Sequence, residues 1–121
     1  MKLSKGNLFE ATTASSARHE QREWHDDIYE SPHVRVTRIE SNAHASPTGF
    51  WYDQPDDEWV AVIAGAAVIE LDDGTRHPMG TGDWLVIPAR CRHRVAETGE
   101  KTIWLAVIAR VLLTQGSSPR M

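Results

Sequence analysis

The chain has 121 residues, a length typical of a single domain. Its net charge of −4 argues against a nucleic-acid-binding surface, which is normally basic. No apolar stretch is long enough for a signal peptide or a membrane span, and a single cysteine, Cys91, excludes an intramolecular disulfide. We therefore expect a cytoplasmic protein with no membrane or nucleic-acid partner.

The two ends of the chain differ in composition from its middle. Residues 1–22 are polar and rich in Ser, Thr and Ala, which indicates an extended N-terminal arm whose Leu8 and Phe9 dock on the body. Residues 114–121 (TQGSSPRM) have the composition of a flexible tail. We assign the folded domain to residues 23–113.

Short segments of β pattern, separated by turn residues, fill this middle part. In chain order they are 23–30, 33–40, 50–53, 58–64, 66–71, 75–79, 84–88, 92–97 and 102–113. The fourth and fifth are separated only by Gly65, a residue that permits a bend or bulge. No segment has a helical stripe with caps. The pattern predicts an all-β fold, an antiparallel sandwich or barrel.

Two of the expected strands, WVAVIA and IWLAVIA, are apolar on both faces. Because side chains alternate along a strand, Glu58, Val60 and Val62 share one face and the residues between them share the other. One face lines the interior, and the other meets a second sheet or another subunit. This pattern favours a homodimer.

Two spaced motifs occur in order within the β region. The fixed positions of the first are Gly49, Glu58 and Gly65, and those of the second are Gly82, Pro88 and His93. Their spacing resembles the two motifs of the cupin family, G-x5-H-x-H-x3-4-E-x6-G and G-x5-P-x-G-x2-H-x3-N. The resemblance is to short single-domain bacterial cupins (the cupin type-2 conserved barrel), and it implies a small antiparallel double-sheet β-barrel of the jelly-roll type.

The first motif is degenerate, because its two histidine positions hold Tyr52 and Gln54. The second motif lacks its glycine and its terminal asparagine. The resemblance implies that Tyr52, Gln54, Glu58 and His93 converge inside an otherwise apolar barrel, the usual arrangement of a small-ligand site.

An ordinary cupin metal site offers three imidazoles and one carboxylate, which suit Fe, Mn, Ni or Zn. Here the candidate metal ligands are His93, Glu58 and Gln54, with the phenol of Tyr52 nearby. Amide and neutral phenol oxygens are weak donors, so metal affinity should fall. The alternatives are one weakly held divalent metal (Zn, Ni, Mn or Fe) or no cofactor.

The same residues can act without a metal. Glu58 and His93 could serve as general base and acid, for instance in an isomerisation. Tyr52 could donate to a developing oxyanion, Gln54 could orient the ligand, and Trp51 could form a wall for a planar or sugar ligand. Alternatively, Glu58 and His93 only satisfy each other as a buried ion pair. The sequence gives His25 no role, since it lacks a neighbour at metal-ligand spacing.

Three functions remain. The favoured one is a cupin that binds a small molecule in its barrel, with or without a weakly held metal. The second is a metal-dependent enzyme, an isomerase or dioxygenase, that uses His93 and Glu58, although a dioxygenase is disfavoured without the first-motif histidines. The third is a structural or regulatory dimer with a filled barrel, which is disfavoured because burying two charged groups without use is costly. Whether the chain is an enzyme stays open.

Overall fold

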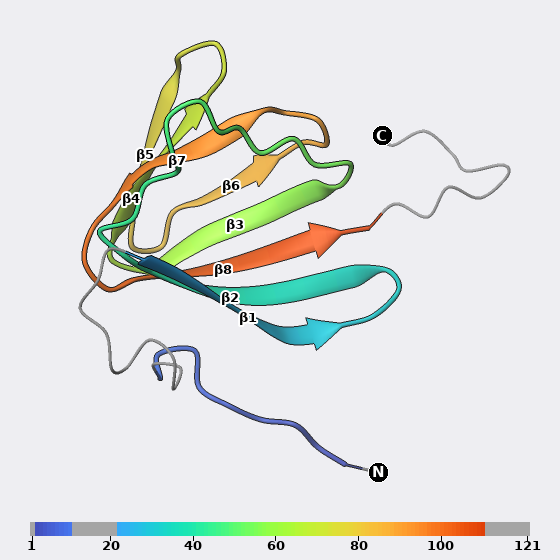
Figure 1. Cartoon of the computed structure of the whole chain (residues 1–121). Coiled ribbons are helices and arrows are strands. Elements are labelled where there is room, and N and C mark those ends of the chain that lie inside the picture. Colours follow the sequence, from blue (N-terminus) through green and yellow to red (C-terminus); the bar gives the residue numbers. More distant parts are fainter. Residues whose placement is uncertain (1, 11–21, 111–121) are drawn as a thin grey trace, which may run out of the picture.

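The computed structural model describes residues 2–10 and 22–110. These residues contain eight strands and no helix (Figure 1). The strands are β1 (Arg22–Glu30), β2 (Val34–Asn42), β3 (Asp57–Ala64), β4 (Ala66–Leu71), β5 (Arg76–Gly80), β6 (Trp84–Ile87), β7 (His93–Thr98) and β8 (Thr102–Ala109). No membrane-spanning helix is therefore found in the described part of the chain.

The strands form two antiparallel sheets that face each other (Figure 1). The larger sheet has the order β1-β2-β8-β3-β6, and the smaller has the order β5-β4-β7. This arrangement confirms the all-β, double-sheet architecture expected from the sequence.

Gly65 carries the chain from one sheet to the other, between β3 and β4. Its φ of +96° lies in the region that favours glycine. A Cβ at this position would approach Thr102 Oγ1 to 2.6 Å and Thr102 Cα to 2.8 Å. The hinge expected at this residue is confirmed, and it requires glycine because there is no room for a Cβ beside Thr102.

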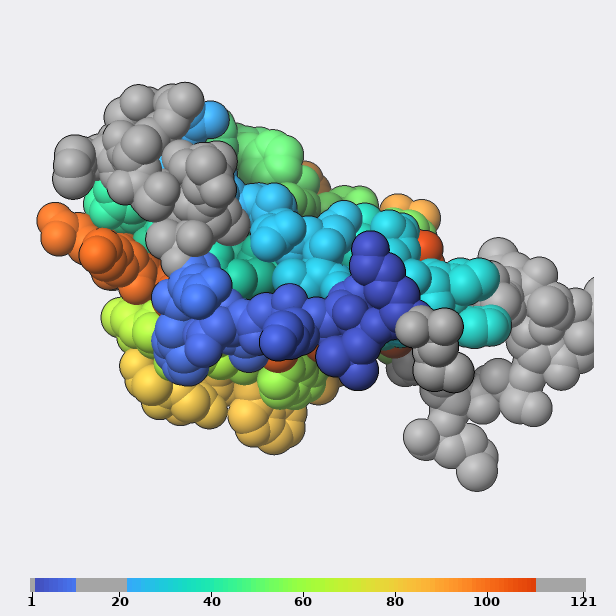
Figure 2. All heavy atoms as spheres, turned by 90° about the horizontal axis from the view of Figure 1, so that it is seen from below, coloured from blue at the N-terminus to red at the C-terminus, as the bar shows by residue number. Residues whose placement is uncertain are grey.

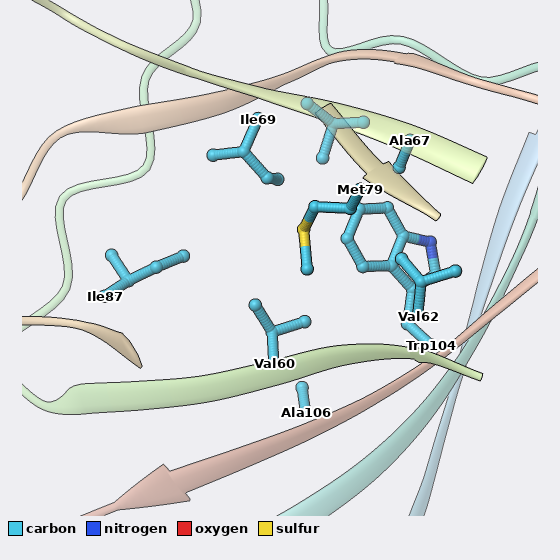
Figure 3. Packing of buried hydrophobic residues seen from close by; sticks show 9 residues of the cluster. Val60, Val62, Ala67, Ile69, Met79, Ile87, Trp104 and Ala106 are labelled. Carbon is cyan, nitrogen blue, oxygen red and sulfur yellow. The ribbon is translucent and has the colours of Figure 1, made fainter. Parts of the chain in front are cut away.

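The core lies between the sheets, where apolar side chains from both sheets pack together (Figure 3). Its buried members are Val60, Val62, Ala67, Ile69, Met79, Ile87, Val95, Trp104 and Ala106. The predicted inward face of β3 is correct, since Val60 and Val62 are buried in this cluster. The buried indole of Trp104 is satisfied by a hydrogen bond from Nε1 to Ser41 Oγ at 3.0 Å.

One expected strand, residues 50–53, does not form. Tyr52 instead makes an isolated antiparallel bridge with His93, in which the two residues exchange backbone hydrogen bonds of 2.7 and 3.2 Å. The carbonyl of Gln54 then accepts from the Arg90 amide, and Pro55 has no amide to donate to a ladder. Pairing therefore stops after a single residue.

The N-terminal arm is described only at residues 2–10, which have no regular secondary structure apart from a turn. These residues lie along the side of the molecule formed by β1 and β2 (Figure 2). The carbonyl of Leu8 accepts a hydrogen bond from Arg38 Nε on β2 at 2.6 Å, whereas Phe9 is exposed. The rest of the expected arm and the tail at 114–121 fall outside the described residues, and β1 begins at Arg22, the last residue assigned to the arm.

Candidate ligand-binding site

A cavity of about 140 Å³ opens between the two sheets, beside the core. Its apolar wall includes Val60, Ile69, Ile87 and Ile108, which come from strands of both sheets. Eight polar or charged side chains also line it: Glu23, His25, Arg35, Thr37, Tyr52, Gln54, Glu58 and His93. The four polar residues expected from the sequence are therefore brought together, along with four that were not expected.

Glu58, His93 and Gln54 form one polar group of the cavity. Gln54 Nε2 donates to Glu58 Oε1 at 3.0 Å, and His93 Nε2 lies 3.8 Å from the same oxygen. His93 Nδ1 is 2.8 Å from the carbonyl oxygen of Cys91. Because a carbonyl can only accept, Nδ1 donates to it, and this leaves Nε2 as the ring nitrogen that faces Glu58. This histidine is buried, at 4% exposure.

Tyr52 lies against this group. Its ring stacks on the imidazole of His93 with the centroids 5.3 Å apart, and Phe50 contacts it edge-on. Burial raises the pKa of the Tyr52 hydroxyl, and the negative charges of Glu23 and Glu58 raise it further. The hydroxyl therefore stays protonated at neutral pH and can donate a hydrogen bond to a ligand.

Trp51 is not among the residues that line the cavity. It lies under the guanidinium of Arg92, whose central carbon is 6.0 Å from the indole centroid. Since neighbouring side chains of an extended segment point to opposite sides, Tyr52 faces the interior and Trp51 faces away from it.

A second acid–histidine pair, on β1, was not expected from the sequence. His25 Nε2 and Glu23 Oε1 are 2.7 Å apart, and Glu23 Oε2 accepts from Ser41 Oγ at 3.1 Å and lies 3.7 Å from His44 Nε2. Burial tends to raise the pKa of Glu23, but the hydrogen bond from His25 and the charges of His44 and His25 outweigh it and lower this pKa. The hydrogen bond to Glu23 raises the pKa of His25, against its partial burial.

Arg35 and Thr37 contribute further polar groups from β2. Thr37 Oγ1 donates to Asp27 Oδ1 at 2.7 Å. Within the described residues, Arg35 Nε is buried and has no hydrogen-bond partner. Strand alternation alone puts 35, 37 and 39 on one face, but the sequence could not show that this face is the inner one, because Val34 and Val36 make the other face more apolar.

The donors of the cavity do not fit a stable metal centre. Across residues 2–10 and 22–110, no group of three or more His, Cys, Asp or Glu side chains is arranged to hold a metal ion. His93 and Glu58 supply one imidazole and one carboxylate, and Gln54 turns an amide N–H, not an oxygen, toward Glu58. An ion here would depend on water for most of its shell.

The fold and the cavity define a double-sheet antiparallel barrel with polar side chains converging in its interior. The chain belongs to the cupin family: the sequence model of the cupin domain matches residues 36–108. The resemblance noted in the two motifs is thereby confirmed.

Solved structures extend the comparison over most of the chain. A Ralstonia eutropha protein provisionally named a mannose-6-phosphate isomerase is 43% identical, with a TM-score of 0.79, over 90% of this chain and 100% of its own. An RmlC-like cupin protein from Desulfovibrio desulfuricans is 20% identical, with a TM-score of 0.69 over 89% of this chain and 97% of its own, and supports the fold alone.

Among curated proteins, Protein SchB from Streptomyces halstedii is 45% identical over 49 residues. The matched segment is 40% of this chain but only 35% of SchB. The chain therefore matches about a third of that relative's length.

Proposed function

We propose that this cupin binds a small organic molecule in the cavity between its sheets. The supporting observation is the cavity itself, with apolar walls and several polar side chains among the residues that line it, which is the usual character of a small-ligand site. Its volume of about 140 Å³ is close to that of a protein cavity of roughly 150 Å³ that holds benzene. An open cavity of this size favours ligand binding over a barrel filled with side chains.

The polar residues have complementary roles in this proposal. Tyr52 donates a hydrogen bond to a ligand oxygen, because its raised pKa keeps the phenol protonated. The 3.8 Å gap between His93 Nε2 and Glu58 Oε1 is longer than a hydrogen bond, so a ligand hydroxyl can interact with both. Gln54 holds Glu58 in place through its 3.0 Å hydrogen bond.

Binding in this proposal needs no metal. The one imidazole and one carboxylate beside each other make any divalent ion (Zn, Ni, Mn or Fe) a weakly held one. Elemental analysis of untagged protein should find much less than one equivalent of each of these metals. A full equivalent that survives dialysis would contradict this part of the proposal.

The binding proposal is tested by a fragment screen followed in 1H–15N spectra of the whole chain. Hits should shift amides of β3, β7 and β8 around the cavity, and His93→Ala should weaken them by at least about tenfold through the lost hydrogen bond and ring contact. The control is His77→Ala, the same change at an exposed position of β5. Unchanged binding by a folded His93→Ala protein would count against the site.

A second candidate function is an isomerase, favoured by the 43% identical Ralstonia eutropha relative. Glu58 would act as the base and His93 as the acid, with Tyr52 stabilising negative charge on a carbonyl oxygen. Mannose 6-phosphate in D₂O would then exchange the proton beside its carbonyl carbon, and Glu58→Gln would stop the exchange. No exchange above the buffer rate leaves ligand binding as the function of the cavity.

A further inference from the structure

Arg35 carries a positive charge and lies in line with Glu58 across three neighbouring strands of the larger sheet. Arg35 pairs with Ile108 across β2 and β8, and Ile108 pairs with Glu58 across β8 and β3. Neighbouring strands lie about 4.8 Å apart, so the two charged residues start roughly 10 Å from each other. All three line the cavity, with the apolar side chain of Ile108 between the two charges.

One N–H donor of the Arg35 guanidinium lacks a hydrogen-bond partner. In the described chain, Arg35 Nε is buried without a hydrogen-bond partner, although a buried N–H is costly to leave unpaired. The register partner of Arg35 on β1 is Glu30, but that carboxylate is exposed and paired with Arg110. Asp27, on the same strand, accepts a hydrogen bond from Thr37.

The two glutamates of the cavity are engaged as well. Glu58 accepts from Gln54 at 3.0 Å, and Glu23 is 2.7 Å from His25. The positive charge of Arg35 opposes protonation of His25, whereas the negative charges of Glu23 and Asp27 favour it, and the pKa of His25 is raised overall. One side of the cavity therefore carries two basic side chains, and a free donor, Arg35 Nε, belongs to one of them.

We propose that Arg35 forms an anion subsite and that the ligand of the barrel is a small organic carboxylate. This inference rests on the proposed binding function and names the ligand class. Guanidinium donors form a planar fork that matches a carboxylate in two parallel hydrogen bonds. In this arrangement the apolar side chain of Ile108 contacts the carbon skeleton of the ligand. The end of the ligand away from its carboxylate reaches Tyr52 and the space between Glu58 and His93.

Cavity size supports a carboxylate over a sugar phosphate. A volume of about 140 Å³ encloses a skeleton of about benzene size. A hexose phosphate is much larger and would leave most of its atoms outside the barrel. The apolar wall of Val60, Ile69, Ile87 and Ile108 also suits a ring or branched chain better than a polyhydroxylated one.

The test compares benzoate with benzamide, a neutral molecule of nearly the same shape. Titrations of the whole 15N-labelled chain should give at least tenfold tighter binding of benzoate, and benzoate should shift the Arg35 Nε–H resonance as it gains a partner. Arg35→Gln should weaken benzoate binding by about tenfold to a hundredfold and leave benzamide binding unchanged. Arg35→Lys, which keeps the charge but loses the fork, should give an intermediate loss.

The matched control is Arg76→Gln, at an exposed position of β5 that does not line the cavity. Equal binding of benzoate and benzamide by the native chain, or equal benzoate binding by a folded Arg35→Gln variant, overturns the anion subsite and leaves the binding function standing. If no probe shifts the cavity amides, both proposals fail. Mannose 6-phosphate and mannose are a second pair of probes that differ in charge. If mannose 6-phosphate binds more tightly than benzoate, and Arg35→Gln weakens that binding, the assignment of the ligand as a carboxylate is overturned.

Discussion

The two acid–histidine pairs of the cavity differ in how closely their atoms meet. Glu23 and His25 are in hydrogen-bond contact at 2.7 Å, whereas His93 Nε2 and Glu58 Oε1 are 3.8 Å apart. In the first pair the two side chains meet each other's hydrogen-bonding needs, and the side chain of His25 is about half exposed. The second pair is buried and keeps binding capacity. In the proposed binding function, ligand contact therefore falls to Glu58 and His93, and the β1 pair contributes only its charges to the edge of the cavity.

The stability contributed by the Glu23–His25 pair should fall at both low and high pH. The pKa of Glu23 is lowered, so its stabilising effect is present above the ordinary value of 4.5 and is lost as pH falls through the folded-state pKa. The pKa of His25 is raised, so its effect is present below 6.5 and is lost as pH rises through the folded-state pKa. Glu23→Gln should therefore lower the pKa of His25 in an NMR titration, with the resonance of exposed His77 as internal reference. An unchanged His25 titration would contradict the contact.

Tyr52 should matter for binding more than for folding. Tyr52→Phe removes one hydroxyl and keeps the ring that stacks on His93, so we expect ligand affinity to fall about threefold to tenfold. The matched control is Tyr29→Phe, at an exposed position of β1, with no effect. Because the pKa of Tyr52 is raised, the native chain should also lose stability as pH rises past 10 through the folded-state pKa, and Tyr52→Phe should lose less. Denaturant titrations at alkaline pH measure this difference.

At the scale of elements, strand positions follow from the sequence because alternation and turn residues act locally. The segment 50–53 has the aromatic composition of a strand, yet only Tyr52 finds a partner, since pairing depends on how the loop crosses β7. The predicted site residues came from motif spacing. Glu23, His25 and Arg35 carry no motif, and their place in the cavity depends on which face of β1 and β2 turns inward, which is decided by packing of distant strands.

The hinge between the sheets gives a prediction about stability. Gly65→Ala places a methyl group in a strained φ and against the backbone of Thr102, so we expect a loss of about 2–5 kcal/mol in the free energy of unfolding. Gly74→Ala is the control, because Gly74 has a similar φ of +90° but open space around a Cβ. That change should cost only about 1–2 kcal/mol. Equal losses in urea denaturation would show that the Thr102 contact is relieved at little cost.

On the scale of the whole molecule, the outer face of the larger sheet is unusually apolar beside its β6 edge. Trp84 and Val86 are 59% and 56% exposed, and they pair in register with Ala61 and Trp59 of β3. Contiguous apolar surface of this kind is typical of a protein interface. It is consistent with the homodimer expected from the doubly apolar strands, which stays a prediction.

That homodimer can be tested through the same edge. If a second copy covers this face, Trp84→Glu places a charge in the interface and should convert the chain to a monomer in light scattering coupled to gel filtration, because an unpaired buried charge is costly. Ile28→Glu introduces the same charge at an exposed position of β1, the opposite edge strand, and should leave the dimer intact. The cavity opens between the sheets and not on this outer face, so the Trp84→Glu monomer should still bind ligand. A native chain that is monomeric at the highest soluble concentration would overturn the dimer, and loss of binding on monomerisation would show that the partner completes the site.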